Sequence, residues 1–357
     1  MPKKIKLSAA TKTFLIAGGT GFLGCHLAAD LLRRGHRVKL LDLEPLTEPG
    51  LWGRVENYQG DIRNKFLVEK LMKGVDFVIQ AAAALPLAPA EEIRTTTIAG
   101  TRIILEAARR NKVKRVVYIS STAVYGVPVK HPILESDERI GVGAYGAAKI
   151  EAEKICENYR RLGMTVPIIR PKTFIGTGRL GVFQILFDWV RRGCRIPVIG
   201  DGSNRYQLMG VEDIVAAIWL TLTKPEKKAN DTFNVGAKKF STVEKDLNQF
   251  FRKVKSKSRV LKTPAGAVKK TLAALEWLRL SPLYAWVYAT ADKDSFVSTE
   301  KIEKQLGWRA KYSNADTLIR TFEWYQKNWK EYEQQTGITH RVAWKQGALK
   351  IVRWVLQ

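Results

Sequence analysis

A glycine-rich stretch, Gly-Gly-Thr-Gly-Phe-Leu-Gly at residues 18–24, constrains the fold of this chain more than any other feature. An apolar run at residues 14–17 precedes it and is typical of a buried strand. A helix-like stretch at residues 26–32 follows it. Glycines between a strand and a helix permit a tight turn and let a pyrophosphate approach the free N–H groups of the helix start. The pattern predicts a dinucleotide site that uses Gly18, Gly21, Phe22, Leu23 and Gly24.

An acidic residue follows the second apolar run. This run, Val-Lys-Leu-Leu at residues 38–41, ends at Asp42. Asp42 lies about 20 residues beyond the glycines, where an acid accepts hydrogen bonds from the adenosine ribose diol. The negative charge of Asp42 would repel a 2′-phosphate. The predicted cofactor is therefore NAD rather than NADP, and the alternative is a glycine turn that binds no ligand.

Composition limits the other classes of function. The chain has 357 residues, of which 45% are hydrophobic, enough for a large core. Its three cysteines, Cys25, Cys156 and Cys194, have no metal or redox spacing, so we expect no metal site and a reducing compartment. No signal peptide or membrane-spanning run is evident, and the expected location is the cytoplasm.

The chain is strongly basic, with a formal net charge of +26. Residues 252–270 contain eight basic residues and no acid, and residues 335–357 contain four basic residues and no acid. No nucleic-acid-binding motif accompanies them, so we expect no nucleic-acid partner. Anionic lipid, an anionic substrate and a merely solvated basic surface remain the alternatives.

Strands and helices alternate along the first half of the chain. Strands are predicted at residues 58–62, 76–80, 114–120 and 166–170, and the clearest helices at residues 100–111 and 145–162. This alternation predicts an α/β fold, a Rossmann-type doubly wound parallel sheet.

The expected domain organisation has three parts. Residues 11–175 form the NAD-binding domain, and residues 176–330 form a smaller C-terminal α/β substrate lobe interleaved with it. Residues 335–357 form a basic amphipathic segment, a candidate for peripheral contact with the inner face of the membrane.

Tyr145 and Lys149 stand four residues apart, on one face of a predicted helix. A tyrosine has a pKa near 10 and is a poor base at neutral pH, but a lysine ammonium one turn away would lower that pKa. Such a pair can exchange a proton with a substrate hydroxyl while hydride moves to or from nicotinamide. Hydroxyls at residues 120–122 end a predicted strand, at the edge of the sheet where ligands of open α/β folds bind.

Taken together, these motifs resemble those of the NAD-dependent epimerase/dehydratase family of extended short-chain dehydrogenases/reductases. The resemblance covers about residues 13–328. Besides the glycine stretch, Asp42 and the Tyr145–Lys149 pair, it rests on the segments at residues 60–62, 81–83, 100–101, 120–126, 170–176, 200–205 and 211–213.

The resemblance implies a role for each matching residue. Tyr145 is implied as the catalytic acid or base, Lys149 as its partner and a ligand of the nicotinamide ribose, and Ser121 as the hydroxyl that binds the reacting oxygen. The further cofactor contacts that it implies are Asp61, Ile62, Ala81, Ala82, Ala83 and Pro171. The implied substrate contacts are Thr122, Lys172, Thr173 and Arg205.

Several positions depart from the family pattern. Gln80 and Thr97 stand where the family often has His and Asn, and Thr173 replaces an Asn that typically contacts a sugar-nucleotide diphosphate. Lys172 or Arg205 could supply that phosphate contact instead. Thr122 and Ala123 stand where dehydratases carry an Asp-Glu pair, which favours epimerisation or simple oxidoreduction over dehydration.

Three functions are therefore weighed. The first is an NAD-dependent oxidoreductase or epimerase of a nucleotide sugar, acting by transient hydride transfer, and the family resemblance implies a homodimer. The second is a dehydrogenase or ketone reductase of a sterol-like or isoprenoid lipid at a membrane surface. The third, a non-catalytic NAD-binding scaffold, is disfavoured because Tyr145, Lys149 and Ser121 are all present.

Overall fold

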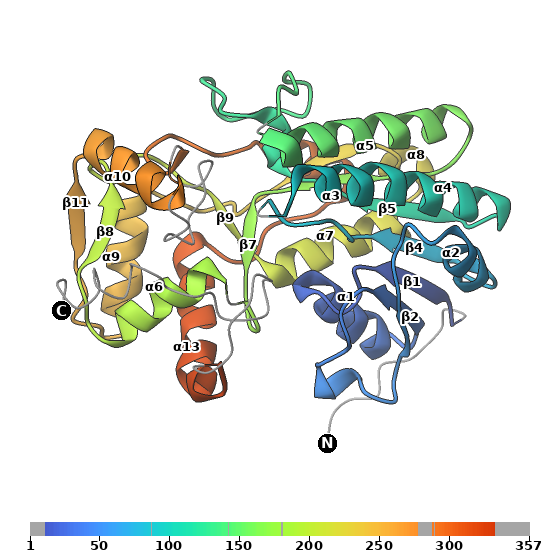
Figure 1. The fold of residues 1–357 in the computed structure, drawn as a ribbon, viewed down its shortest axis with the longest axis horizontal. Helices are drawn as coiled ribbons and strands as arrows, with labels where there is room; N and C mark the ends of the chain where they lie inside the picture. Colours follow the sequence, from blue (N-terminus) through green and yellow to red (C-terminus); the bar gives the residue numbers. More distant parts are fainter. Residues whose placement is uncertain are drawn as a thin grey trace.

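A computed structural model describes residues 11–332, apart from 87, 142, 180, 278–287 and 289. Its centre is a seven-stranded parallel sheet in the order β10-β6-β5-β4-β1-β2-β3 (Figure 1). The strands are β1 (Thr13–Ala17), β2 (Arg37–Asp42), β3 (Glu56–Gln59), β4 (Phe77–Gln80), β5 (Arg115–Ile119), β6 (Ile168–Pro171) and β10 (Thr232–Val235). This arrangement confirms the predicted doubly wound α/β fold. The order of the strands reverses between β1 and β4, the place where such sheets bind ligands.

Helices cover both faces of this sheet. Phe14 and Ile16 of β1 pack toward the α1 and α7 side, whereas Leu15 and Ala17 pack toward the side of α2, α4 and α5. Successive side chains of a strand point to opposite faces, so burial on both faces explains the uninterrupted apolar run. The helices of these two layers are α1 (Phe22–Arg33), α2 (Lys65–Met72), α3 (Ala90–Arg94), α4 (Gly100–Arg110), α5 (Gly143–Arg161) and α7 (Val211–Thr223), with the shorter turns η1 (Pro49–Leu51), η2 (Thr95–Ala99) and η3 (Thr122–Tyr125).

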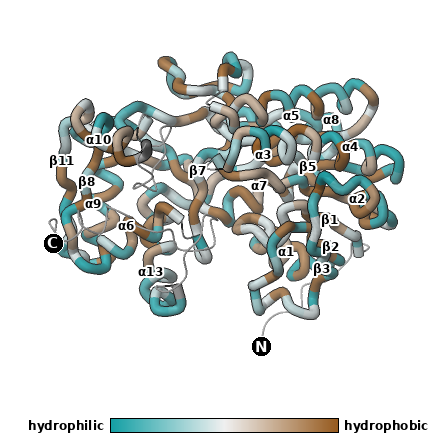
Figure 2. The backbone as a smooth tube through the Cα atoms, viewed as in Figure 1, coloured by the Kyte–Doolittle hydropathy of each residue, from teal (hydrophilic) through white to brown (hydrophobic). Residues whose placement is uncertain are grey.

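A second lobe has its own core, built around Phe187, Phe250 and Phe322. In Figure 2 its hydrophilic positions gather on outer turns, for example at the lower end of α13. The elements of this lobe are β7 (Thr173–Ile175), α6 (Val182–Arg191), β8 (Ile196–Ile199), β9 (Leu208–Gly210), α9 (Val243–Lys253), β11 (Val260–Thr263), α10 (Ala265–Trp277) and α13 (Asn314–Tyr332). β8 pairs with β11, and β7 pairs with β9, each in parallel.

The chain returns to the first lobe after entering the second. β10 pairs with β6 at the edge of the central sheet, and α12 (Glu300–Leu306) packs on β10 and on α8 (Glu226–Ala229). The two lobes are therefore interleaved, and the boundary at residue 175 stays a prediction. Residues 335–357 lie outside the described part of the chain. Within the described residues, no helix is both long and apolar enough to cross a bilayer.

Candidate active site

A large cavity of about 2210 Å³ lies at the carboxyl ends of the central strands and extends into the second lobe. Every cofactor and catalytic residue predicted from the sequence lines it, from the glycine turn to Pro171. Of the predicted substrate residues, Thr122, Lys172 and Thr173 line it and Arg205 does not. Segments far apart in the sequence therefore converge on one site.

The glycine turn is built so that strand and helix approach each other closely. Gly18 has a φ of +78°, and a Cβ on it would lie 2.7 Å from the backbone nitrogen of Ala82. A Cβ on Gly24 would lie 2.2 Å from the carbonyl oxygen of Gly18. α1 begins at Phe22, and no side chain caps its first turn. The N–H groups of that turn face the cavity and suit the pyrophosphate of a dinucleotide.

Asp42 is held in place before any ligand binds. Its carboxylate accepts hydrogen bonds from the backbone N–H groups of Thr20, at 3.0 Å, and Glu44, at 3.2 Å. It stands at the end of β2 on the cavity wall, next to the glycine turn. The carboxylate is therefore both a candidate ribose acceptor and a brace for that turn.

Replacing Asp42 tests the assignment of the cofactor. Asp42→Ala should weaken NAD binding by about 1.5–3 kcal/mol, the range for hydrogen bonds to a charged group. Because alanine also frees the Thr20 N–H, Asp42→Asn is the matched variant, since it keeps an acceptor and removes the charge. It should lose most of the preference for NAD over NADP while melting near the wild-type temperature. Titrations followed by fluorescence measure both affinities, and equal wild-type affinities for NAD and NADP would contradict the assignment.

Tyr145, Lys149 and Ser121 meet where β5 ends and α5 begins. The Nζ of Lys149 is buried, donates a 2.8 Å hydrogen bond to the carbonyl oxygen of Ile119 and lies 5.8 Å from the centre of the Tyr145 ring. Tyr145 and Ser121 both line the cavity, and Ser121 is close enough to Tyr145 to lower its pKa. Ser121 also accepts a 3.1 Å hydrogen bond from the N–H of Ala123, which orients its side chain. Two hydroxyls thus converge on one point in the cavity.

The acid–base character of the pair differs from the expectation that Lys149 lowers the pKa of Tyr145. Burial raises the pKa of Tyr145 to about 12, and the neighbouring Ser121 opposes this only in part. Burial also lowers the pKa of Lys149 to about 8, against the attraction of Glu153. Desolvation by burial is the largest cause of the pKa shift of both groups. Tyr145 is therefore a protonated hydroxyl at neutral pH in this structure.

A buried ionic network behind the site was not predicted from the sequence. Glu153, one turn after Lys149, is 0% exposed and pairs with Arg170 and Arg139 at 2.7 and 2.9 Å. It also accepts a hydrogen bond from Ser120. Burial raises the pKa of Glu153, but these partners outweigh it and hold the pKa below its usual range. The network fixes α5 against β5 and β6, which positions Lys149 and Ser121. In the sequence, this network is indicated by Glu153, an acidic residue four positions after Lys149.

The predicted substrate residues separate into two groups. The hydroxyl of Thr173 lies 3.1 Å from that of Tyr206, and both residues line the cavity. The guanidinium of Arg205, in contrast, stacks over the rings of Phe240 and Phe296 at 4.9 and 4.4 Å from their centres. Arg205 is exposed and outside the cavity lining, so its role as a phosphate contact stays a prediction that would require this side chain to move.

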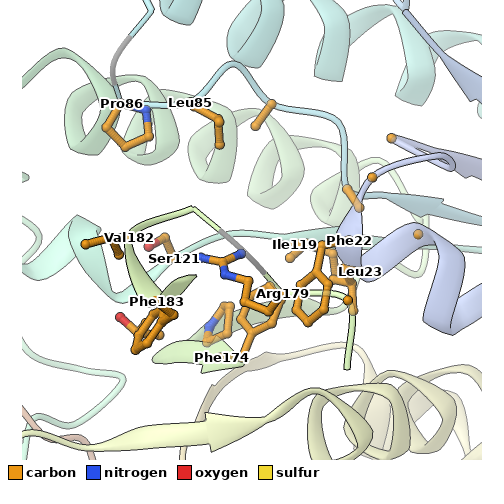
Figure 3. Close-up of a pocket in the computed structure, with 18 of the residues that line it drawn as sticks. Phe22, Leu23, Leu85, Pro86, Ile119, Ser121, Phe174, Arg179, Val182 and Phe183 are labelled. Carbon is orange, nitrogen blue, oxygen red and sulfur yellow. The ribbon is translucent and has the colours of Figure 1, made fainter. Parts of the chain in front are cut away.

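Arg179 is a cavity residue that sequence motifs did not reveal. Its guanidinium lies 5.3 Å from the centre of the Phe22 ring and 5.8 Å from the centre of the Phe174 ring. Figure 3 shows the three side chains next to one another in the cavity. Phe22 is the first residue of α1. A cation and the start of a helix therefore lie side by side, and both favour a bound anion.

The described residues hold no candidate metal site. They contain no group of three or more His, Cys, Asp or Glu side chains able to hold a metal ion. The thiols of Cys25, Cys156 and Cys194 are all buried. The uncapped first turn of α1, the glycine cradle and the oriented Asp42 instead fit a dinucleotide.

Fold and site thus define a dinucleotide-dependent α/β enzyme, and comparison with known proteins gives its family. The model of the NAD dependent epimerase/dehydratase family matches residues 14–236. The protein y4nG of Sinorhizobium fredii, which is uncharacterized, is 34% identical over 357 residues, which cover 99% of this chain and 88% of y4nG. The UDP-glucose 4-epimerase of Lactobacillus helveticus is 26% identical, with 90% of this chain and 99% of that protein covered.

A solved structure agrees on the fold. The crystal structure of UDP-glucose 4-epimerase from Thermotoga maritima, with UDP-glucose, superposes with a TM-score of 0.73 at 22% identity, over 89% of this chain and 99% of that one. The chain belongs to the NAD-dependent epimerase/dehydratase family. It is an enzyme of the extended short-chain dehydrogenase type, and its cofactor is NAD.

Proposed function

We propose that this enzyme acts on a nucleotide sugar, as an epimerase or as a simple oxidoreductase. The observation that carries the proposal is the continuity of the cavity. It runs from the glycine turn past Tyr145 and Ser121 to Lys172 and Thr173, and then between β8 and α13 of the second lobe. Such a cavity suits an extended ligand whose reacting end lies at Tyr145 and whose long polar end lies further along the cavity. Relatives described as UDP-glucose 4-epimerases support the same substrate class.

In the proposed mechanism NAD supplies a hydride acceptor next to the substrate. The deprotonated form of Tyr145 would accept the proton of the reacting sugar hydroxyl, and Ser121 would donate a hydrogen bond to the same oxygen. Since burial keeps Tyr145 protonated on its own, its deprotonated form needs the positive charge of Lys149 close by. The carbonyl of Ile119 and the Glu153 network hold that ammonium in position.

The residues after Ser121 favour epimerisation or simple oxidoreduction over dehydration. Thr122 lines the cavity and Ala123 is buried, so no carboxyl group occupies the place of the Asp-Glu pair. Elimination of water needs an additional acid and base, which this part of the site lacks.

Mass spectrometry of the purified protein tests the proposal. We expect bound NAD together with a uridine or thymidine diphosphate compound. Native spectra of the same sample report whether the chain forms the homodimer that we propose from the family resemblance. Recovery of a lipid in place of a nucleotide sugar would contradict the proposed substrate class.

A lipid alcohol or ketone is the second candidate, because the part of the cavity in the second lobe is largely apolar. Its lining includes Phe183, Leu186, Val198, Leu247, Leu318 and Trp324. The basic run at residues 252–270 gives this candidate less support, since Lys262 pairs with Glu244 and Lys269 with Asp292.

Liposome binding separates the two candidates. If residues 335–357 form an interfacial helix, binding should require anionic lipid and weaken with salt, since each basic residue near such a surface contributes about 1 kcal/mol. Replacing Trp344 and Trp354 by Ala should weaken binding further through lost apolar burial. Co-sedimentation measures this, and absent or salt-insensitive binding would remove the main support for a lipid substrate.

A further inference from the structure

Lys172 is a buried amine on the wall of the cavity. It stands between Pro171, the last residue of β6, and Thr173, the first residue of β7, and is 4% exposed. Its Nζ donates a 2.6 Å hydrogen bond to the hydroxyl of Ser295 and lies 4.9 Å from the centre of the Tyr206 ring. Neither contact carries a negative charge, and no carboxylate of the described residues forms an ion pair with it.

The other buried lysine of the cavity, Lys149, is different. Lys149 interacts with the buried carboxylate of Glu153, one helical turn away, and donates to a backbone carbonyl. Lys172 receives no such compensation from the part of the chain that the structure describes. Burying an ammonium group without a partner costs free energy, and a partner of opposite charge offsets that cost.

The side chain of Lys172 is partly protonated and partly neutral near neutral pH, because of its surroundings. Burial lowers the pKa of Lys172 to about 7. Tyr206 is neutral, because burial raises its pKa. His131 has a lowered pKa, first through burial, and it also feels Asp294 and the like charges of Lys172 and Arg205. Among the described residues, no carboxylate in direct contact with the Nζ of Lys172 would compete with a bound anion.

We propose that Lys172 is the receptor for an anionic oxygen group of the substrate, a phosphate or a carboxylate. The proposal rests on the proposed nucleotide-sugar function, whose substrates carry such groups. The neighbouring hydroxyls of Thr173 and Tyr206, 3.1 Å apart, and the hydroxyl of Ser295 can donate further hydrogen bonds to the same group. Thr173 and Lys172 together thus replace the Asn contact that this chain lacks.

Proton uptake is the consequence that separates this role from a structural one. An anion favours the ammonium over the neutral amine. At a pH near 7, part of the Lys172 population is neutral, so binding draws a proton from solvent onto Nζ. The heat of binding should then depend on the ionisation enthalpy of the buffer.

The test is calorimetric titration of the NAD-saturated protein with UDP-glucose, UDP-glucuronate and pyrophosphate. Lys172→Met removes the charge at similar volume, and Lys239→Met makes the same change at an exposed lysine. Lys172→Met should weaken binding about tenfold to a hundredfold, the effect of losing a hydrogen bond to a charged group, and should abolish proton uptake. Lys239→Met should change neither. Unchanged NAD affinity shows that each variant is folded.

The three ligands identify the source of the anion. Equal weakening for both UDP sugars assigns Lys172 to the diphosphate, and weakening for UDP-glucuronate alone assigns it to a sugar carboxylate. If the wild type binds the UDP sugars and Lys172→Met binds them equally well, the proposal is overturned. If the wild type binds neither sugar, the proposed function fails and pyrophosphate decides. Weaker pyrophosphate binding by Lys172→Met then upholds the anion receptor, and equal or absent binding overturns it.

Discussion

Replacing Tyr145 by Phe is expected to lower turnover about 10²–10⁴-fold, the contribution typical of a positioned proton-transfer group. The change removes only the hydroxyl that converges with Ser121. The ring stays, with the Nζ of Lys149 5.8 Å from its centre, so NAD affinity should remain near the wild-type value. Steady-state rates and NAD titrations of the same preparations measure the two effects separately.

Tyr58→Phe is the matched control for this variant. It also removes one tyrosine hydroxyl, which bonds Glu56 on β3, away from the residues that line the cavity. Its turnover should equal that of the wild type. If Tyr145→Phe retained full activity, another group would handle the proton and the catalytic assignment would be wrong.

Replacing Gly21 by Ala is expected to lower NAD affinity at least about tenfold while the protein stays folded. Gly21 precedes α1 with ordinary extended dihedral angles, φ −68° and ψ 172°. A Cβ there would lie 3.3 Å from the carbonyl oxygen of Gly18, which a small shift accommodates. The added methyl group would instead occupy the space where a pyrophosphate approaches the helix start. Thermal melting and NAD titration measure the two properties.

Substitutions of two further glycines serve as controls for the Gly21→Ala variant. Gly24→Ala should disrupt the fold itself, because its Cβ would lie 2.2 Å from a backbone oxygen. Gly266→Ala should be harmless, because nothing lies within 4 Å of its Cβ position. Normal NAD binding by Gly21→Ala would contradict the assignment of the turn as the pyrophosphate site.

Local patterns in the sequence predict cofactor residues that the structure brings together on the wall of one cavity. The glycine turn, Asp42 and the Tyr145–Lys149 pair each lie within one or two consecutive elements, and their spacing reflects strand and helix geometry. The predicted boundaries of α4 and β5 also agree closely with the structure, because these elements have strongly periodic or apolar patterns. The strand predicted at residues 58–62 instead lies at residues 56–59, where the sequence is more polar.

The substrate half depends on contacts between distant segments, which spacing does not reveal. Lys172 meets Ser295, 123 residues further on, and Arg205 stacks on Phe240 and Phe296 rather than facing the cavity. The family resemblance gave Arg205 a role by position alone. The effect of burial on the pKa of Tyr145 also comes from tertiary packing, which the spacing of Tyr145 and Lys149 does not reveal.

The most direct test of the central claim is spectroscopic. The NAD-loaded protein is mixed with a panel of uridine and thymidine diphosphate sugars, and the absorbance of reduced nicotinamide is followed while the sugar products are analysed by NMR. We predict that at least one sugar nucleotide reduces the bound NAD, transiently or lastingly, and is converted, and that Tyr145→Phe does neither. Reduction of NAD by a lipid alcohol, with none of the sugar nucleotides converted, would contradict the account.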